Sequence, residues 1–559
     1  MMRTTFALVA SLLIACGPGA RHSGDDDDGP DASTCNNACS ADGHSIVDCH
    51  NNTLETCEGG AACDPSTYTC ADACTAAESN HRSVGCDYYA TDMDSLFTGY
   101  CYAVFVANTW TSPAHINVEY KGQQLNVAQF TRIPSGSGPS LTQGTFDPTA
   151  GLAPGQVAIL FLGGSQGSAP NCPVTPAAAA PALSGTGISD SFHIKTDVPV
   201  VAYQINPYGG GSVAVTAASL LLPTSVWDQE YVAVNVSAAS AGNPSMNIVA
   251  KEDGTTVTLT PNATLGGAGG IPSGAAGSPV TINLNKGQHA QITQPTELTG
   301  STVQSNKPVG FMAGHTCMNM PVGTSYCDHG EQMVAPVQAL GSRYVGVMYR
   351  PRVAQETGTY WRVIGAVDGT QLTYSSNVGG PTTLTKGQQV LFQTGTPFTV
   401  QSQDNDHPFM LFTYMTSSNA VSDGYGDPDF VTSVPPEQYL QNYVFFTDPT
   451  YPETNIVMVR ARSTIDNNFH DVMLDCAGAV TGWQPIGNGD FEYARKDLMT
   501  GNFAPVGTCS TGRHEIKSDA PFGLWVWGWG TPNTSTFTAN VSYGYPGGMN
   551  VSPINNVIL

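Results

Sequence analysis

The chain has 559 residues and a formal net charge of −24, with 20 Lys and Arg against 44 Asp and Glu. This acidity argues against a nucleic-acid-binding protein, because the phosphate backbone requires a basic surface. Only 11% of the residues are charged, against roughly 25% in ordinary globular domains. Such a composition is typical of secreted all-β proteins and disfavours amphipathic helices, which need a charged face.

The first 16 residues have the features of a bacterial lipoprotein signal. Arg3 gives a short positive segment, residues 6–14 are apolar, and residues 13–16 (Leu-Ile-Ala-Cys) resemble a lipobox, in which Cys16 becomes lipidated. The apolar run is too short to span a bilayer, and Gly17 is typical of sorting to the outer membrane. We therefore expect an exported outer-membrane lipoprotein at the bacterial cell surface. The alternative is an ordinary signal peptide with a chance cysteine.

The next two segments are expected to be an acidic tether and a disulfide-stapled module. Residues 17–34 contain four consecutive aspartates and no core-forming run, which predicts a disordered tether. In residues 35–86, seven cysteines fall within forty residues and Cys86 completes eight. An even set of cysteines in an exported chain predicts disulfides. A zinc module is the alternative, but no Cys-x2-Cys pair occurs.

Residues 87–559 consist of short β-branched and aromatic runs separated by Gly, Pro, Asn and Ser, which predicts strands. Four segments align on an extended strand after a proline, and these prolines are 109, 100 and 113 residues apart: Pro199, Pro308, Pro408 and Pro521. We expect an all-β fold of tandem β-sandwich-like repeats of about 105 residues, with copies at about 100–235, 236–350, 351–447 and 448–559. A propeller is the alternative, although its blades usually take only about 40–50 residues.

The stretch GHTCMNMPVGTSYCDHGEQ (314–332) belongs to the second copy alone. Cys317 and Cys327 enclose a short loop with a proline and a glycine, which favours a disulfide. The other cysteines of the repeats pair by elimination as Cys101–Cys172 and Cys476–Cys509.

The same stretch carries candidate ligand-binding residues. One interpretation is a zinc site of His315, Cys317, Cys327 and His329, which requires reduced thiolates outside the cytoplasm. With the disulfide formed, four side chains would remain clustered at a loop tip, where they could bind a divalent ion or another ligand: His315, Asp328, His329 and Glu331.

Two further motifs are binding candidates. Trp525, Trp527 and Trp529 lie on one face of a predicted strand and could stack on sugar rings or form a core face. The acidic loop 422–429 offers Asp423, Asp427 and Asp429 as calcium ligands, with a solvated turn as the alternative. We expect no other cofactor.

The sequence GHTCMNMPVGTSYCDHGEQMVAP, preceded by STVQSNKPV and followed by GSRYVGV, resembles the N-terminal domain of the IgGFc-binding protein family and its bacterial relatives. The loop GYGDP (424–428) and the stretch PPEQY (435–439) resemble the third copy in that family, so the resemblance covers roughly residues 100–550. It implies a secreted or surface β-rich binding module, without implying that this chain binds immunoglobulin.

We therefore expect a non-enzymatic binding or adhesion module for an extracellular protein or glycan, anchored to the outer membrane through its lipid. One alternative is a structural envelope protein without a soluble ligand. Another is an extracellular hydrolase, which would need an acid pair or a triad that we do not find in the sequence.

Overall fold

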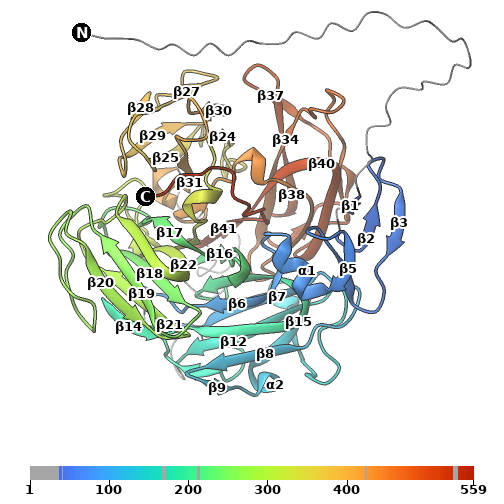
Figure 1. Cartoon of the computed structure of the whole chain (residues 1–559), viewed down its shortest axis with the longest axis horizontal. Coiled ribbons are helices and arrows are strands. Elements are labelled where there is room, and N and C mark those ends of the chain that lie inside the picture. The colour runs from blue at the N-terminus through green and yellow to red at the C-terminus, as the bar shows by residue number, and fades with distance from the viewer. Residues whose placement is uncertain are drawn as a thin grey trace, which may run out of the picture.

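The computed structural model describes residues 37–40, 42–97, 99–165, 171–210, 214–421, 425–532 and 539–559. Figure 1 shows four β-rich lobes around a common centre, with the cysteine-rich module packed against one side. The described part is almost entirely β-structure, as predicted, and its two α-helices are short: α1 (Ala73–Ser79) and α2 (Val127–Phe130). No helix of the described residues is long and apolar enough to cross a membrane.

Disulfides hold the cysteine-rich module together. Its strands are β1 (Ala38–Cys39), β2 (Ser45–Val47), β3 (Thr53–Thr56), β4 (Ala61–Asp64) and β5 (Thr69–Asp72). Its own buried apolar cluster is very small, so covalent links replace a hydrophobic core. The links within the described part are Cys39–Cys63, Cys57–Cys70 and Cys74–Cys86. These six sulfurs are therefore not available as zinc ligands.

The four lobes are four repeats of one topology. Repeat 1 (residues 85–220) contains β6 (Gly85–Ala90), β7 (Tyr102–Asn108), β8 (Ile116–Tyr120), β9 (Gln123–Gln124), β10 (Thr131–Ser135), β11 (Thr142–Thr145), β12 (Val157–Gly164), β13 (Ala178–Ala179), β15 (Phe192–Asn206) and β16 (Ala217–Leu220). Repeat 2 (228–333) contains β17 (Asp228–Val232), β18 (Pro244–Ala250), β19 (Thr255–Thr260), β20 (Val280–Leu284), β21 (Gln288–Thr293), β22 (Thr302–Met318) and β23 (Asp328–Met333), and β14 (Gly187–Asp190) joins its sheet.

The other two repeats follow the same order. Repeat 3 (343–432) contains β24 (Arg343–Gly346), β25 (Thr359–Gly365), β26 (Thr370–Gln371), β27 (Thr373–Tyr374), β28 (Thr383–Leu384), β29 (Gln389–Thr394), β30 (Phe398–Gln401), β31 (Phe409–Met415) and β32 (Asp429–Thr432). Repeat 4 (440–546) contains β33 (Leu440–Thr447), β34 (Glu453–Ala461), β35 (Val472–Leu474), β36 (Gly478–Ala479), β37 (Gln484–Ile486), β38 (Phe491–Thr500), β39 (Ala504–Pro505), β40 (Gly512–Trp529) and β41 (Ser542–Pro546).

Each repeat is organised by the strand that carries the aligned proline. In repeat 2, the first part of β22 pairs with β17 and β19, and the part after Pro308 pairs with β18 and β23. Strands β15 and β40 change partners in the same way, and in repeat 3 the strand is divided into β30 and β31. The proline thus marks where one strand passes from one layer of the repeat to the other.

A tyrosine hydroxyl fixes this passage in every repeat. It donates a hydrogen bond to the carbonyl of the residue that follows the proline, and the pairs are Tyr88–Val200, Tyr231–Val309, Tyr344–Phe409 and Tyr443–Phe522. These tyrosines lie on β6, β17, β24 and β33. The copy boundaries expected from the sequence place β17, β24 and β33 at the end of one copy. In the structure each of them pairs with the proline-bearing strand of the next copy, so each repeat begins with its tyrosine strand.

The last strand of each repeat lies at the centre of the molecule. Strand β16 contacts β23 and β41, and β32 contacts the same two strands, so the four inner strands form a closed ring. Gln332 links across it, because its side-chain amide donates to Ala218 O at 2.8 Å and to Gly544 O at 2.9 Å. The ring brings together residues from all four repeats that lie far apart in the sequence.

Candidate functional site

The structure places the four candidates of the 314–332 stretch in the ring and not at a loop tip. His315 lies near the end of β22, and Asp328, His329 and Glu331 lie on β23. All four are fully buried, so the loop-tip prediction is wrong. The polar segment after Cys327 is a strand because its backbone pairs with β22 and its side chains meet polar groups of the neighbouring repeats.

The disulfides of the repeats join the expected cysteines. Cys317–Cys327 encloses residues 318–326, and the other two bridges are Cys101–Cys172 and Cys476–Cys509. Because the Cys317 and Cys327 sulfurs are bonded to each other, they offer no thiolates, and the zinc set with His315 and His329 does not form.

Buried polar groups surround Glu331. The Gln204 side chain donates to Glu331 Oε2 at 2.7 Å, and His329 Nε2 lies 3.7 Å from the same oxygen. Burial raises the pKa of Glu331, and burial together with Glu331 raises the pKa of Asp92 to about 8. Burial lowers the pKa of His315 to about 4. These groups are closed off from solvent, so they cannot meet a large substrate or ligand.

The predicted calcium loop is only partly described. Asp423 lies outside the described residues, whereas Asp427 and Asp429 are buried at the entrance to β32. Both lie near Asp328 of repeat 2, and burial together with the Asp427 and Asp429 carboxyls raises the pKa of Asp328 well above its usual range. The sequence analysis grouped the aspartates of one loop, but the fold adds a carboxyl from another repeat.

The tryptophan row belongs to the core. Trp525, Trp527 and Trp529 are 8%, 2% and 0% exposed. The Trp525 indole N–H donates to Thr432 O at 3.0 Å, and the Trp529 indole N–H donates to Glu453 at 3.2 Å. A sugar ring needs an open aromatic face, so this row is not a glycan site.

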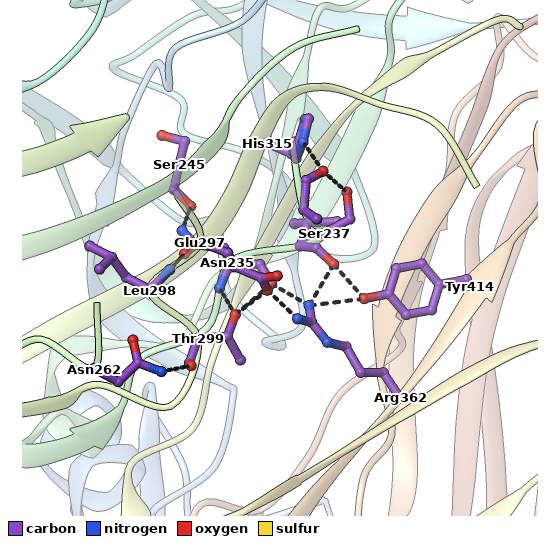
Figure 2. Close-up of polar contacts among 12 residues, drawn as sticks. Asn235, Ser237, Ser245, Asn262, Glu297, Leu298, Thr299, His315, Arg362 and Tyr414 are labelled. Atoms are coloured by element: carbon purple, nitrogen blue, oxygen red, sulfur yellow. Dashed lines mark hydrogen bonds and ion pairs between the residues drawn. The ribbon is translucent and has the colours of Figure 1, made fainter. Parts of the chain in front are cut away.

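A buried ion pair joins repeats 2 and 3. Figure 2 shows the Arg362 side chain of β25 directed at Asn235 and Glu297 of repeat 2. The guanidinium donates to Asn235 O at 2.8 Å and to Val236 O at 2.9 Å, and it pairs with the Glu297 carboxylate. The Tyr414 hydroxyl donates to the Val236 carbonyl as well. This network fixes the two repeats relative to each other.

Four equivalent loops meet at one end of the ring, and we call this end the loop face. Each loop leads from the proline strand to the inner strand of its repeat. Their described parts are residues 207–210 and 214–216, 319–327, 416–421 and 425–428, and 530–532 and 539–541. Backbone hydrogen bonds connect neighbouring loops, from Ser417 N to Met320 O at 2.8 Å and from Gly426 N to Gly530 O at 3.1 Å. The Thr216 hydroxyl donates to Ser542 O, at the start of β41, at 2.7 Å, and Thr216 N–H donates to Asp328 Oδ1, at the start of β23, at 3.2 Å.

The loop face carries exposed apolar side chains that the sequence analysis did not select. Val322 and Tyr326 are 54% and 46% exposed, and the neighbouring Leu96 and Phe97 are 46% and 40% exposed. Leu96 is held there because its N–H donates to Thr316 O at 2.9 Å. The Phe97 ring stacks on Tyr100 with centroids 5.2 Å apart. The only signal in the sequence is an apolar residue within a turn-forming segment.

The four loops also differ from the rest of the chain in charge. They contain no Lys, Arg or Glu, and Asp423 and Asp427 are their only charged residues. They are rich in Gly, Ser, Thr, Asn and Tyr, the residues that antibody loops use for adaptable polar contacts and aromatic anchors. A face with few charges and with exposed apolar side chains, on a strongly acidic protein, is suited to a macromolecular contact.

A cavity lies where the cysteine-rich module meets repeats 1 and 4. This cavity of about 280 Å³ is lined by His44, Trp110, Asn442 and Arg513, among others. The His44 and Trp110 rings are in contact, with centroids 4.1 Å apart. The volume is at the lower limit for a small-molecule site.

The family described as IgGFc binding protein matches residues 217–528. The human protein named "IgGFc-binding protein" is 24% identical over 300 residues, which is 52% of this chain and 5% of the human chain. The matched region runs from β16 to β40 and so includes most of the ring.

Proposed function

Because this chain belongs to the IgGFc-binding protein family, we propose that it is a non-enzymatic binding module for an extracellular protein and that the loop face is its binding surface. The family match carries the function, and the exposed side chains of the loop face carry the location. The chain spans only 5% of the human relative, so the partner of that protein is a starting point for the search and no more.

The chemistry of the loop face favours a protein partner. Hot spots of protein interfaces are aromatic or large apolar residues that become buried on binding. Phe97, Val322 and Tyr326 are such residues, and they stand among small polar ones. The disulfide Cys317–Cys327 holds the loop of Val322 and Tyr326, which lowers the conformational entropy lost on binding.

The proposal includes export and anchoring. The lipobox at residues 13–16 and the cysteine content support an exported lipoprotein, tethered through Cys16 to the bacterial outer membrane with the ring displayed at the cell surface. A tether of small and acidic residues would hold the ring away from the lipid. Adhesion to an extracellular protein is the role that fits this placement.

A binding screen with matched variants tests the proposal. The purified chain is passed over immobilised immunoglobulin G, mucin and polysaccharides, and saturable binding is measured. Phe97→Ala and Tyr326→Ala should weaken binding at least about tenfold each, as expected for hot-spot side chains. Leu391→Ala is the control, because Leu391 is also 46% exposed but lies on β29, outside the loops. Binding that all three variants retain would remove the loop face as the site.

A further inference from the structure

The cavity between the cysteine-rich module and repeats 1 and 4 is built from three parts of the chain that lie far apart in the sequence. The module contributes Asp42 and His44, repeat 1 contributes Trp110, and repeat 4 contributes Asn442 and Arg513. The cavity shares Asp42 and Asn442 with a more open hollow of about 420 Å³, which is lined by residues of β33, β35 and β40, among others. A ligand with one end in the cavity therefore has room to continue outward.

The walls of the cavity are held in place by the protein itself. In repeat 1, the Asn108 side chain accepts a hydrogen bond from Trp110 N–H at 2.8 Å and fixes the turn after β7. In the module, Cys63 N–H donates to Gly43 O at 2.9 Å, and the disulfide Cys39–Cys63 joins the two sides of the same turn. A site with ordered walls loses little conformational entropy when a ligand binds.

Three side chains of the lining have a buried polar atom that lacks a hydrogen-bond partner among the described residues. These atoms are Trp110 Nε1, Asn442 Oδ1 and Arg513 Nε. Buried polar groups are normally paired, so three unpaired ones around one cavity indicate a missing partner. The indole and guanidinium nitrogens can only donate, and the amide oxygen can only accept. A partner for all three must both donate and accept, as hydroxyl groups do.

The charges of the lining are balanced. Asp42 and Glu515 line the cavity together with Arg82 and Arg513, and Arg513 Nη2 lies 3.4 Å from Glu515 Oε2. An anionic ligand would meet the two carboxylates, and a cationic ligand would meet the two guanidinium groups. The open hollow has more carboxylates than basic side chains, so it disfavours an anionic chain as well. Like charges placed together are costly, and a neutral ligand avoids both conflicts.

The cavity also has an aromatic wall. The His44 and Trp110 rings are in contact, with their planes at 41°. Aromatic side chains with a few placed polar groups are typical of small-molecule sites, and a volume of about 280 Å³ leaves room for one small ring. A sugar ring combines apolar C–H faces with a rim of hydroxyls. It therefore matches both the aromatic wall and the unpaired donors and acceptor.

We propose that this cavity is a glycan-binding site, which holds one neutral sugar ring of an oligosaccharide while the rest of that chain lies in the open hollow along β40. The Trp110 indole and the Arg513 guanidinium donate to sugar hydroxyls, and Asn442 Oδ1 accepts from one. The cysteine-rich module completes the site by supplying one of its walls. The lining residues lie outside the four loops of the loop face, so the glycan site and the protein-binding surface are separate.

The test is calorimetric titration of the full chain with four neutral tetrasaccharides: cellotetraose, maltotetraose, mannotetraose and N-acetylchitotetraose. At least one of them should bind saturably, whereas the anionic tetragalacturonate and the peptide tetraalanine should not. The proposal is overturned if no neutral tetrasaccharide binds at millimolar concentration. Tighter binding of tetragalacturonate or tetraalanine would overturn it as well.

Two conservative variants locate the site. Trp110→Phe keeps an aromatic wall and removes the N–H, and Asn442→Leu removes the acceptor at similar size. Each should weaken tetrasaccharide binding about two- to tenfold, as expected for one hydrogen bond. Trp483→Phe is the matched control, because its indole donates to Val480 O at 2.9 Å outside the cavity. Tyr326→Ala on the loop face should also bind the sugar like wild type, so this proposal and the proposed protein binding can fail independently. Unchanged affinity in both site variants would contradict the site.

A measurement on the wild-type chain covers the case in which the two variants do not fold. Bound tetrasaccharide should protect His44 from modification by diethyl pyrocarbonate, as followed by mass spectrometry. His50 is the control, because it belongs to the same module but is exposed and does not line the cavity. Modification of His44 that is as fast with sugar as without it would place the sugar elsewhere and refute the proposal.

Discussion

Removing one tyrosine hydroxyl should show how much its hydrogen bonds stabilise the point at which a strand passes between the two layers of a repeat. Tyr344 is 1% exposed, and its hydroxyl donates to Phe409 O at 2.8 Å and accepts from Gly341 N at 3.0 Å. Tyr344→Phe keeps the aromatic side chain and removes both hydrogen bonds. The buried carbonyl of Phe409 then loses this donor.

The expected loss follows from these two bonds. A net hydrogen bond contributes about 0.5–1.5 kcal/mol, and a buried group left unsatisfied costs about 1–3 kcal/mol. Tyr344→Phe should therefore lower the free energy of unfolding by about 2–4 kcal/mol. The value is obtained from urea unfolding followed by tryptophan fluorescence, as the change in midpoint multiplied by the slope.

Tyr360→Phe is the matched control in the same repeat, because Tyr360 is only partly buried. It should change the free energy of unfolding by less than about 0.5 kcal/mol, as surface substitutions usually do. If Tyr344→Phe lies within that limit too, the hydroxyl does not fix the strand, and the same reasoning fails for the tyrosines of the other repeats.

Three further predictions concern the rest of the molecule. Arg362→Met should destabilise the fold by about 3 kcal/mol in urea, because it leaves the largely buried Glu297 carboxylate without its partner; if adding Glu297→Gln restores none of this loss, the pair is not coupled. Replacing Cys317 and Cys327 by serine should cost about 3 kcal/mol, since the bridge closes a sequence separation of 10; an unchanged melting temperature would contradict this. The pKa of Asp92 is raised to about 8, so its folded form holds a proton more tightly than the unfolded chain does. Its stabilising contribution is complete below about pH 4 and is lost as the pH rises through about 8, and Asp92→Asn should reduce that loss between pH 5 and pH 8.5.

The strands of each repeat could be predicted from the sequence, but the ring of inner strands could not. The aligned prolines and the short β-branched and aromatic runs predict four β-rich repeats. Both signals can be recognised within a single segment, because a proline at a strand start and alternating apolar residues are local features. The segment after Cys327 reads as a polar loop, since Asp328, His329, Glu331 and Gln332 are polar. It becomes a buried strand only because repeats 1, 3 and 4 supply partners such as Ala218 O and Gly544 O.

The candidate site residues likewise divide into those that local sequence groups correctly and those that only tertiary contacts bring together. Sequence proximity grouped Asp427 and Asp429, which do lie together, but nothing local relates them to Asp328 about a hundred positions earlier. The tryptophan row reads equally well as a core face or a sugar platform, because the two differ only in what covers the strand. Covering elements come from distant parts of the chain, so tertiary contacts decide the role of such residues.

Ring closure has a consequence for how the chain folds. Strand β41 completes the ring by contacting β16, and Ser83 N–H donates to Met549 O at 2.9 Å, so the first repeat is completed by a segment that is synthesised after all the other strands of the ring. Contacts this far apart in sequence form slowly. Until residues 542–551 arrive, the inner face of three repeats remains open to water, to proteases and to chaperones. A chain shortened before β41 should therefore be degraded as an open horseshoe, even though repeats 1 to 3 keep their complete sets of strands.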